Sequence, residues 1–198
     1  MKKIGVLYGS PRRQGNTARL TGQAVRGARD SGAEVVEFVL RDLKISPCLE
    51  IYGCRQNGRC VIKDDFQTVV DELESCQGII LSSPIFFYAV SGHTKAFMDR
   101  FQSRWVKKYW LDKVPFNQPG NWKKGLFIAA GATRGRQLFT GAALTVRYFF
   151  DALDTELWRS LLYRGLDGAD DVLSYPEYLE EAYQSGKDLV LSLQEGQA

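Results

Sequence analysis

The segment YGSPRRQGNT, residues 8–17, lies between the apolar run Lys3–Tyr8 and a run of helical periodicity that begins at Thr17. A strand, a short polar loop and a helix in this order form the start of a βα unit. The N–H groups at a helix N-terminus and the positive end of the helix dipole attract anions. Gly9 and Gly15 permit backbone geometry that other residues resist. The loop therefore predicts a phosphate site with polar groups from Ser10, Arg12, Asn16 and Thr17.

The spacing of this loop excludes two common phosphate motifs. A P-loop has lysine directly after its second glycine and four residues before that glycine, whereas this chain has Asn16 and five residues. The dinucleotide fingerprint GxGxxG is absent as well. An ordinary turn, in which Ser and Thr cap the helix and the arginines are solvated, remains the alternative at this point.

The rest of the chain continues the alternation of strands and helices. Apolar runs predict strands at 3–8, 34–40, 77–82, 124–130 and 155–163, and helical patterns predict helices at 17–31, 65–75, 92–110, 138–153 and 175–194. Strict alternation predicts an α/β fold with a parallel sheet and right-handed crossovers. We expect a single domain over residues 1–198, with long loops at 41–64 and 111–123.

The composition excludes several classes of function. Basic and acidic residues nearly balance, with a net charge of +3, which argues against a nucleic-acid partner. No apolar run has the length of about 18 residues that a membrane span needs, and the first strand begins too early to leave room for a signal peptide. We therefore expect a cytoplasmic protein, in which four cysteines do not form a disulfide framework.

Two further loops follow predicted strands at the same edge of the sheet, where ligands of parallel sheets bind. The loop SSPIFFYAVSG, residues 82–92, contains three consecutive aromatic residues, and the loop GATRG, residues 131–135, begins with Gly131. The aromatic run predicts a flat apolar wall; the alternative is that two of the rings pack into the core. A phosphate site, an aromatic wall and a glycine turn at one edge suit a planar ring with a monophosphate tail, and FMN is the economical ligand.

Four stretches resemble a known family: GSPRRQGNT (9–17), PCLEIYGCRQNGRCVIKDD (47–65), SSPIFFYAVSGHTKAFMDR (82–100) and YPEYLEEAYQSGK (175–187). They resemble the flavodoxin-like NAD(P)H-dependent FMN reductases, most closely the branch that includes the iron–sulfur flavoproteins. The resemblance implies a doubly wound five-stranded parallel sheet of order 2-1-3-4-5. It implies FMN phosphate at Ser10, Arg12, Asn16 and Thr17, and an isoalloxazine ring bordered by Pro84, Ile85, Phe86 and Phe87, with Gly131 nearby. Phe86 stands where the family usually has Tyr, so ring stacking is retained without the hydroxyl.

The cysteine loop departs from the pattern of the iron–sulfur members. Those proteins carry C-x2-C-x2-C and a fourth cysteine, and here Cys48, Cys54 and Cys60 match while Ile51 takes the second position. Because an iron–sulfur cluster normally needs four ligands, we expect no intact cluster and no metal. We also expect the Ile51 side chain to fill the space a cluster would take. Zinc with a borrowed ligand and a transient disulfide are the alternatives, and Cys76 is expected to be a small buried apolar residue.

The resemblance implies an oxidoreductase that passes electrons from NAD(P)H through FMN to a small acceptor such as a flavin or a quinone. FMN carries the chemistry, so no catalytic side chain is assigned. The alternative is a flavodoxin-like electron carrier that serves a protein partner. Arg134 and Arg136 either meet the phosphates of the nicotinamide dinucleotide or are simply solvated. The family implies a homo-oligomer, in which the aromatic stretch 104–123 covers a neighbouring site.

Overall fold

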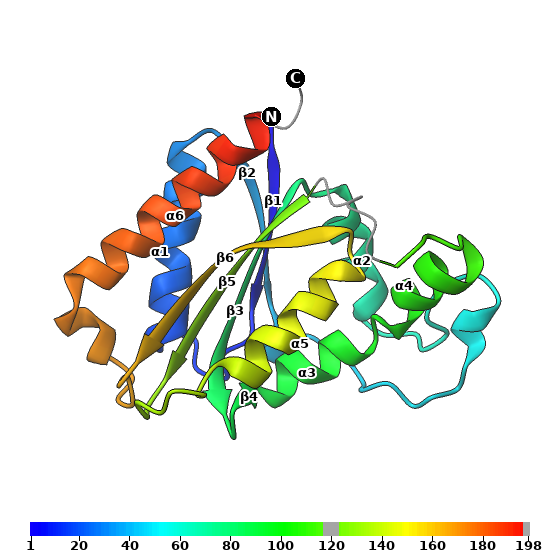
Figure 1. Cartoon of the computed structure of the whole chain (residues 1–198), viewed down its shortest axis with the longest axis horizontal. Coiled ribbons are helices and arrows are strands. Elements are labelled where there is room, and N and C mark those ends of the chain that lie inside the picture. The colour runs from blue at the N-terminus through cyan, green and yellow to red at the C-terminus, as the bar shows by residue number, and fades with distance from the viewer. Residues whose placement is uncertain (117–122, 196–198) are drawn as a thin grey trace.

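The computed structural model describes residues 1–116 and 123–195. Five parallel strands form one sheet in the order β2-β1-β3-β5-β6 (Figure 1). Their bounds are Lys3–Tyr8 for β1, Glu34–Val39 for β2, Gly78–Phe86 for β3, Lys123–Gly131 for β5 and Thr155–Arg164 for β6. Numbered along the chain without the short β4 (Ala89–Val90), this is the predicted order 2-1-3-4-5, and the α/β flavodoxin-like fold is confirmed.

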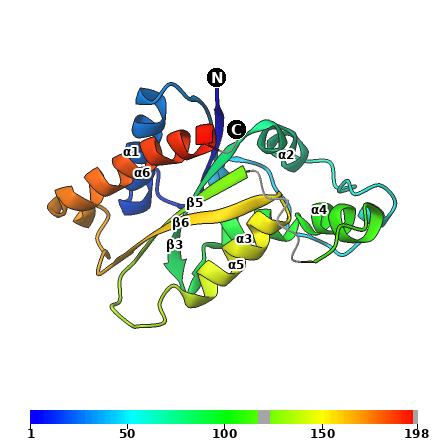
Figure 2. The same ribbon diagram turned by 45° about the horizontal axis from the view of Figure 1, so that its top comes forward.

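Helices cover both faces of the sheet, as Figures 1 and 2 show. On one face lie α1 (Asn16–Asp30) and α6 (Pro176–Glu195), which pack with Ile4, Val6 and Ile128 of the strands. On the other face lie α2 (Phe66–Ser75), α3 (Gly92–Asp99) and α5 (Thr140–Asp151), which share a second core. Continuous apolar strands between two helical layers explain why β1, β3 and β5 are buried over nearly their whole length.

The packing of α1 on α6 depends on glycine. A Cβ atom at Gly27 would lie 2.0 Å from the carbonyl oxygen of Tyr183, and one at Gly186 would lie 1.9 Å from that of Ala24. The two backbones therefore approach more closely than side chains would allow. At the end of α1, Gly32 has a φ of +81° and follows the helix as predicted.

Two predicted boundaries were wrong. β3 extends to Phe86, so Pro84, Ile85 and Phe86 belong to a strand, which pairs with the unpredicted β4 in a hairpin. The predicted helix at 92–110 is divided into α3, α4 (Gln102–Val106) and a π-helical turn, Lys107–Leu111. The division has a local cause, because the N–H groups of Arg100 and Phe101 bond three residues back, to Phe97 and Met98.

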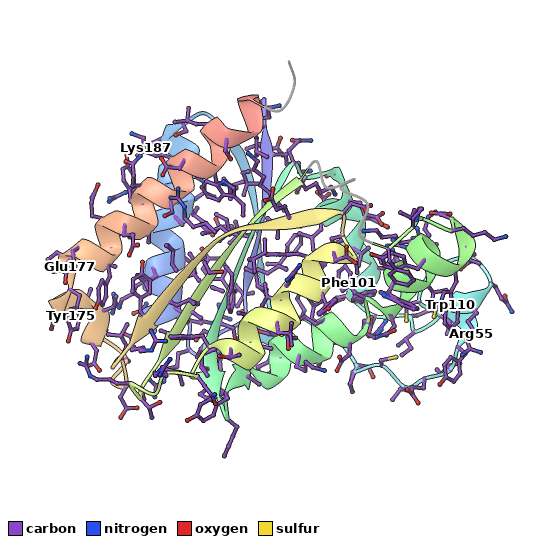
Figure 3. The ribbon with its side chains drawn as sticks, viewed as in Figure 1. Arg55, Phe101, Trp110, Tyr175, Glu177 and Lys187 are labelled. Carbon is purple, nitrogen blue, oxygen red and sulfur yellow. The ribbon has the colours of Figure 1, made fainter. Side chains whose placement is uncertain are left out.

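The loop between β2 and α2 forms a lobe with α4 and the π turn. It contains two 3₁₀ turns, Leu40–Asp42 and Gly53–Arg55. At the outer end of the lobe the Arg55 guanidinium stacks on Tyr52, 4.1 Å from the ring centre, and lies 5.2 Å from that of Trp110 (Figure 3). The predicted loop 111–123 includes 117–122, which lie outside the described residues. Within the described ranges, no helix combines the length and apolar character that a bilayer span requires.

Candidate cofactor-binding site

A cavity of about 240 Å³ lies at the carboxyl edge of the sheet, where β1, β3, β5 and β6 end (lower edge of Figure 1). Eight of the nine predicted site residues line it: Ser10, Arg12, Asn16, Thr17, Pro84, Ile85, Phe86 and Gly131. Phe87 does not. The structure thus brings the three predicted loops together, and their proposed contacts with FMN stay predictions.

The N-terminus of α1 forms the polar wall of this cavity. Its N-cap, Gly15, offers no side chain to the first N–H groups of the helix, and the first turn contains no acidic residue. These N–H groups and the partial positive charge of the helix dipole are therefore available to an anion. Ser10, which is 5% exposed, accepts a hydrogen bond from the N–H of Arg12 at 3.1 Å and so tightens the turn.

Gly9 joins this turn to the end of β3. Its N–H donates to the carbonyl of Ser82 at 2.8 Å, and its carbonyl accepts the hydroxyls of Ser91 and Thr94 at the start of α3. A Cβ atom here would lie 1.9 Å from the Thr94 hydroxyl oxygen. Gly9 and Gly15 do not have positive φ angles, so Gly9 is needed for close approach and not for an unusual backbone conformation.

The side chain of Asn16 has a structural partner that sequence reasoning missed. Its amide donates to the carbonyl of Gly168 at 2.7 Å and accepts the N–H of Val172 at 3.0 Å. It therefore ties α1 to the loop after β6. The exposed Arg12 reaches the same loop, 3.4 Å from the carbonyl of Asp167. This contact is long, so the Arg12 guanidinium retains most of its donors for a ligand.

The end of β3 forms the apolar wall, and the hairpin beyond it has an unusual turn. Phe87 and Tyr88 are the two loop residues between β3 and β4, with φ angles of 49° and 62°. Positive φ at both positions is the geometry of a type I′ turn, which usually takes Asn-Gly. The alternative of two inward rings was wrong, because Phe86, Phe87 and Tyr88 are 50%, 102% and 53% exposed.

The opposite side of the cavity comes from the ends of β5 and β6. A Cβ atom at Gly131 would lie 2.9 Å from the Leu138 side chain, so glycine allows the loop after β5 to fold back closely. Ala132, Leu166 and Asp167 also line the cavity. The sequence analysis did not select Ala132, Leu166 or Asp167, because their residue types do not suggest a site. The segment 164–168 reaches the cavity only through the parallel pairing of β6 with β5.

The cysteine loop lies in the lobe and is held by a buried arginine. Arg100, only 1% exposed, donates from Nε to the Cys60 sulfur at 3.1 Å and from Nη1 and Nη2 to the Asp64 carboxylate at 2.7 and 3.2 Å. It also donates to the carbonyls of Ser46 and Ile62. Burial raises the pKa of Asp64, but hydrogen bonds from Arg100 and two backbone N–H groups outweigh it and hold the pKa below its usual range.

The expected role of Ile51 was wrong. Its side chain is 58% exposed and fills no cavity, so Arg100 rather than Ile51 fixes this loop. Burial raises the pKa of the Cys54 thiol, and the neighbouring Cys60 and Cys48 add to this effect. Over the described part of the chain, no group of three His, Cys, Asp or Glu side chains is placed to hold a metal ion. Cys76 is fully buried between α2 and β3, as predicted.

Known proteins resemble this chain in sequence and in fold. An iron–sulfur flavoprotein of Methanocaldococcus jannaschii is 36% identical over 76% of this chain and 71% of its own length, and a second from that organism is 38% identical over 50% and 51%. The chain thus spans about half the length of several of these relatives. The NAD(P)H:quinone oxidoreductase from Methanothermobacter marburgensis shares the fold, with a TM-score of 0.70, 12% identity and coverage of 94% and 95%. The family model for NADPH-dependent FMN reductases matches residues 2–153, and the chain belongs to this family.

Proposed function

We propose that this protein is an FMN-dependent oxidoreductase that takes electrons from NAD(P)H and passes them to a small acceptor, such as a flavin or a quinone. The main support for this proposal is that one cavity combines an uncapped helix N-terminus with an apolar wall. Membership of the NADPH-dependent FMN reductase family supports both the cofactor and the donor.

The cavity suits FMN in the chemistry of its two walls. The N–H groups at the start of α1, Ser10 and the Arg12 guanidinium would bind the phosphate. Pro84, Ile85 and Phe86 would border the ring. When bound, FMN supplies the redox chemistry, accepting electrons from a nicotinamide and releasing them to an acceptor. The residues of the two walls would hold the phosphate and position the ring.

Absorbance spectroscopy of the purified protein tests this proposal. We expect a flavin spectrum, acid release of FMN rather than FAD by mass spectrometry, and rapid bleaching when NADH or NADPH is mixed in anaerobically. A protein that binds FMN but is not bleached by either nicotinamide would instead be the flavodoxin-like carrier. Release of FAD, or no flavin binding after incubation with FMN, would contradict the proposed cofactor.

The Arg12→Ala variant should bind FMN more weakly by about 1.5–3 kcal/mol, the range for a hydrogen bond to a charged group. The reason is that the exposed guanidinium lies at the cavity beside the α1 N-terminus and, among the described residues, forms a single long hydrogen bond, to the carbonyl of Asp167. Fluorescence titration with FMN and with riboflavin, which has no phosphate, measures the effect. Riboflavin affinity should hardly change; equal losses for both ligands would mean that Arg12 acts through the fold.

We also predict that the wild-type protein contains no stable four-iron cluster. Ile51 has no lone pair for iron, and the Cys60 sulfur already accepts a hydrogen bond from Arg100. Iron and acid-labile sulfide analysis after anaerobic purification, with electron paramagnetic resonance of the reduced protein, provides the measurement. Near-stoichiometric iron with a cluster signal in wild type would contradict the prediction. A cluster gained only in Ile51→Cys would support it. Without a cluster, electrons in the natural chain would pass directly between FMN and the acceptor.

The proposal also includes a cytoplasmic location and a homo-oligomer. Leu144 and Tyr148, four residues apart on α5, are 56% and 66% exposed, and Phe87 in the β3–β4 hairpin is fully exposed. Exposed apolar side chains of this size favour contact with another protein surface. We expect no nucleic-acid or membrane partner, in keeping with the small net charge. The proposed covering role of 104–123 concerns a stretch whose residues 117–122 lie outside the described ranges.

A further inference from the structure

The segment that connects β6 to α6 forms a further wall of the cofactor cavity (lower left of Figure 1). It ends in the 3₁₀ turn Asp171–Ser174. Leu166 and Asp167 line the cavity, and the N–H of Leu166 donates to the carbonyl of Gly131 at 3.2 Å. The family model matches the chain only as far as residue 153. The family match therefore assigns this segment no role.

The carboxylate of Asp171 holds two peptide groups of this wall. Its Oδ2 atom accepts the N–H groups of Asp167 and Gly168, at 2.8 Å each. Hydrogen bonds to an ionised carboxylate are among the strongest in proteins. A Cβ atom at Gly168 would lie 2.6 Å from Oδ1 of Asp171, so glycine gives the carboxylate room to approach. Because Asp171 is not among the residues that line the cavity, it can act on a ligand only through the residues that it holds.

The carbonyl groups of the same two residues contact the polar side of the cavity. The carbonyl of Gly168 accepts the Asn16 amide at 2.7 Å, and the carbonyl of Asp167 lies 3.4 Å from Nη1 of Arg12. Asn16 and Arg12 both line the cavity, and both are predicted phosphate ligands. An asparagine amide has two N–H donors, so the bond to Gly168 leaves the second one for a ligand. Asp171 therefore sets the positions of the acceptors that orient both side chains.

The base of the turn is anchored to α1 by other contacts. The N–H of Val172 donates to Oδ1 of Asn16 at 3.0 Å, and the Val172 side chain is fully buried in the core beneath α1 and α6. Asp170 forms an ion pair with Arg19 of α1. None of these contacts involves the Asp171 carboxylate. Its removal should therefore free the backbone of residues 166–168 without detaching the turn from α1.

We propose that Asp171 is a positioning residue for the cofactor, because its carboxylate fixes the two peptide groups that orient Arg12 and Asn16 toward the phosphate of FMN. The inference rests on the proposed function, in which FMN occupies this cavity. The sign of the effect distinguishes positioning from direct electrostatics. A carboxylate near a phosphate repels it, so removal of the charge alone should strengthen FMN binding. Removal of a positioning group should weaken it.

Fluorescence titration of the full chain with FMN and with riboflavin tests the inference. For Asp171→Ala we expect FMN to bind about tenfold or more weakly and riboflavin to change by less than about threefold, since only FMN has the phosphate. Near-normal riboflavin binding also shows that the variant is folded. Asp171→Asn retains an oxygen acceptor and should stay within about threefold of wild type for both ligands.

Asp170→Ala is the matched control, because Asp170 is the preceding carboxylate, pairs with Arg19 and does not line the cavity. Its affinity for both flavins should equal that of wild type. Unchanged or tighter FMN binding in Asp171→Ala would overturn the inference. Equal losses for FMN and riboflavin would overturn it as well, because Asp171 would then act through the fold.

A second variant moves the carboxylate without removing its charge. In Gly168→Ala the new Cβ would lie 2.6 Å from Oδ1 of Asp171, so FMN affinity should fall to a similar extent. The double variant Gly168→Ala/Asp171→Ala should bind FMN no more weakly than Asp171→Ala, because both changes break the same contact. Additive losses would overturn the inference.

The behaviour of the wild-type protein separates this inference from the proposed function. Wild type that binds neither flavin would overturn both. Wild type that binds FMN but is not bleached by NADH or NADPH would contradict the proposed reductase alone, and an FMN-specific loss in Asp171→Ala would then still support the inference.

Discussion

The Gly9→Ala variant should lose about 1–3 kcal/mol of unfolding free energy, the usual range for an overpacked site, and should bind FMN about tenfold or more weakly. A single methyl group has this effect because it would lie 1.9 Å from the Thr94 hydroxyl and 2.5 Å from the carbonyl oxygen of Ser82. The oxygen belongs to the backbone of the sheet, so the turn that carries the phosphate site must move. Urea denaturation and fluorescence titration with FMN measure the two losses.

Two further variants make this result interpretable. Gly22→Ala lies on the exposed side of α1 with nothing within 4 Å of the new Cβ, so it should stabilise the protein by up to about 1 kcal/mol. Gly9→Ala/Thr94→Ala removes the closer of the two obstacles and should recover part of the lost FMN affinity. An unchanged denaturation midpoint together with unchanged FMN affinity in Gly9→Ala would show that this contact is unimportant.

The parts of the site that sequence predicted are those encoded locally. The turn at 9–17 and the apolar end of β3 each lie within one short stretch, and their meeting follows from the parallel order of the strands. The type I′ turn at Phe87 and Tyr88 was missed because this geometry usually requires Asn or Gly. The fully exposed Phe87 shows that an aromatic residue in a site loop need not face the cavity.

The contacts that sequence could not predict join distant segments. The residues beside Asn16 in the sequence predict a phosphate ligand, but its side-chain amide forms hydrogen bonds with the backbone of Gly168 and Val172, more than 150 residues away in the sequence. Arg100 follows a helical pattern in which an arginine is normally solvated, and nothing local indicates that Ser46, Cys60 and Asp64 will surround it.

Replacement of Arg100 by methionine should have the largest effect on stability, a loss of about 3–5 kcal/mol, the range for breaking a buried ion pair. All five N–H donors of the guanidinium have acceptors, and the group lies 4.6 Å from the centre of the Phe66 ring. Methionine fills a similar volume but leaves the Asp64 carboxylate, 11% exposed, without its partner. Chemical denaturation gives the free energy of unfolding.

The same variant should release the cysteine loop. Arg100 connects the loop to the end of α3 through Ser46, Cys60, Ile62 and Asp64. Without it, Cys48, Cys54 and Cys60 should react faster with Ellman's reagent, whereas the buried Cys76 should remain protected. A stable variant whose thiols react at the wild-type rate would show that other contacts hold the loop.

The Asp64 carboxylate provides a pH test of the same pair. Its folded-state pKa is depressed by the hydrogen bonds from Arg100 and the backbone despite burial. Its contribution to stability is therefore present above the unfolded-state pKa of about 3.9 and is lost as the pH falls through the lower folded-state pKa. The stability difference between wild type and Asp64→Asn should accordingly shrink below about pH 4. The double variant Arg100→Met/Asp64→Leu should be more stable than Arg100→Met alone, because it leaves no unpaired buried charge. If the double variant were instead less stable than either single change, the pair would not account for the order of this loop.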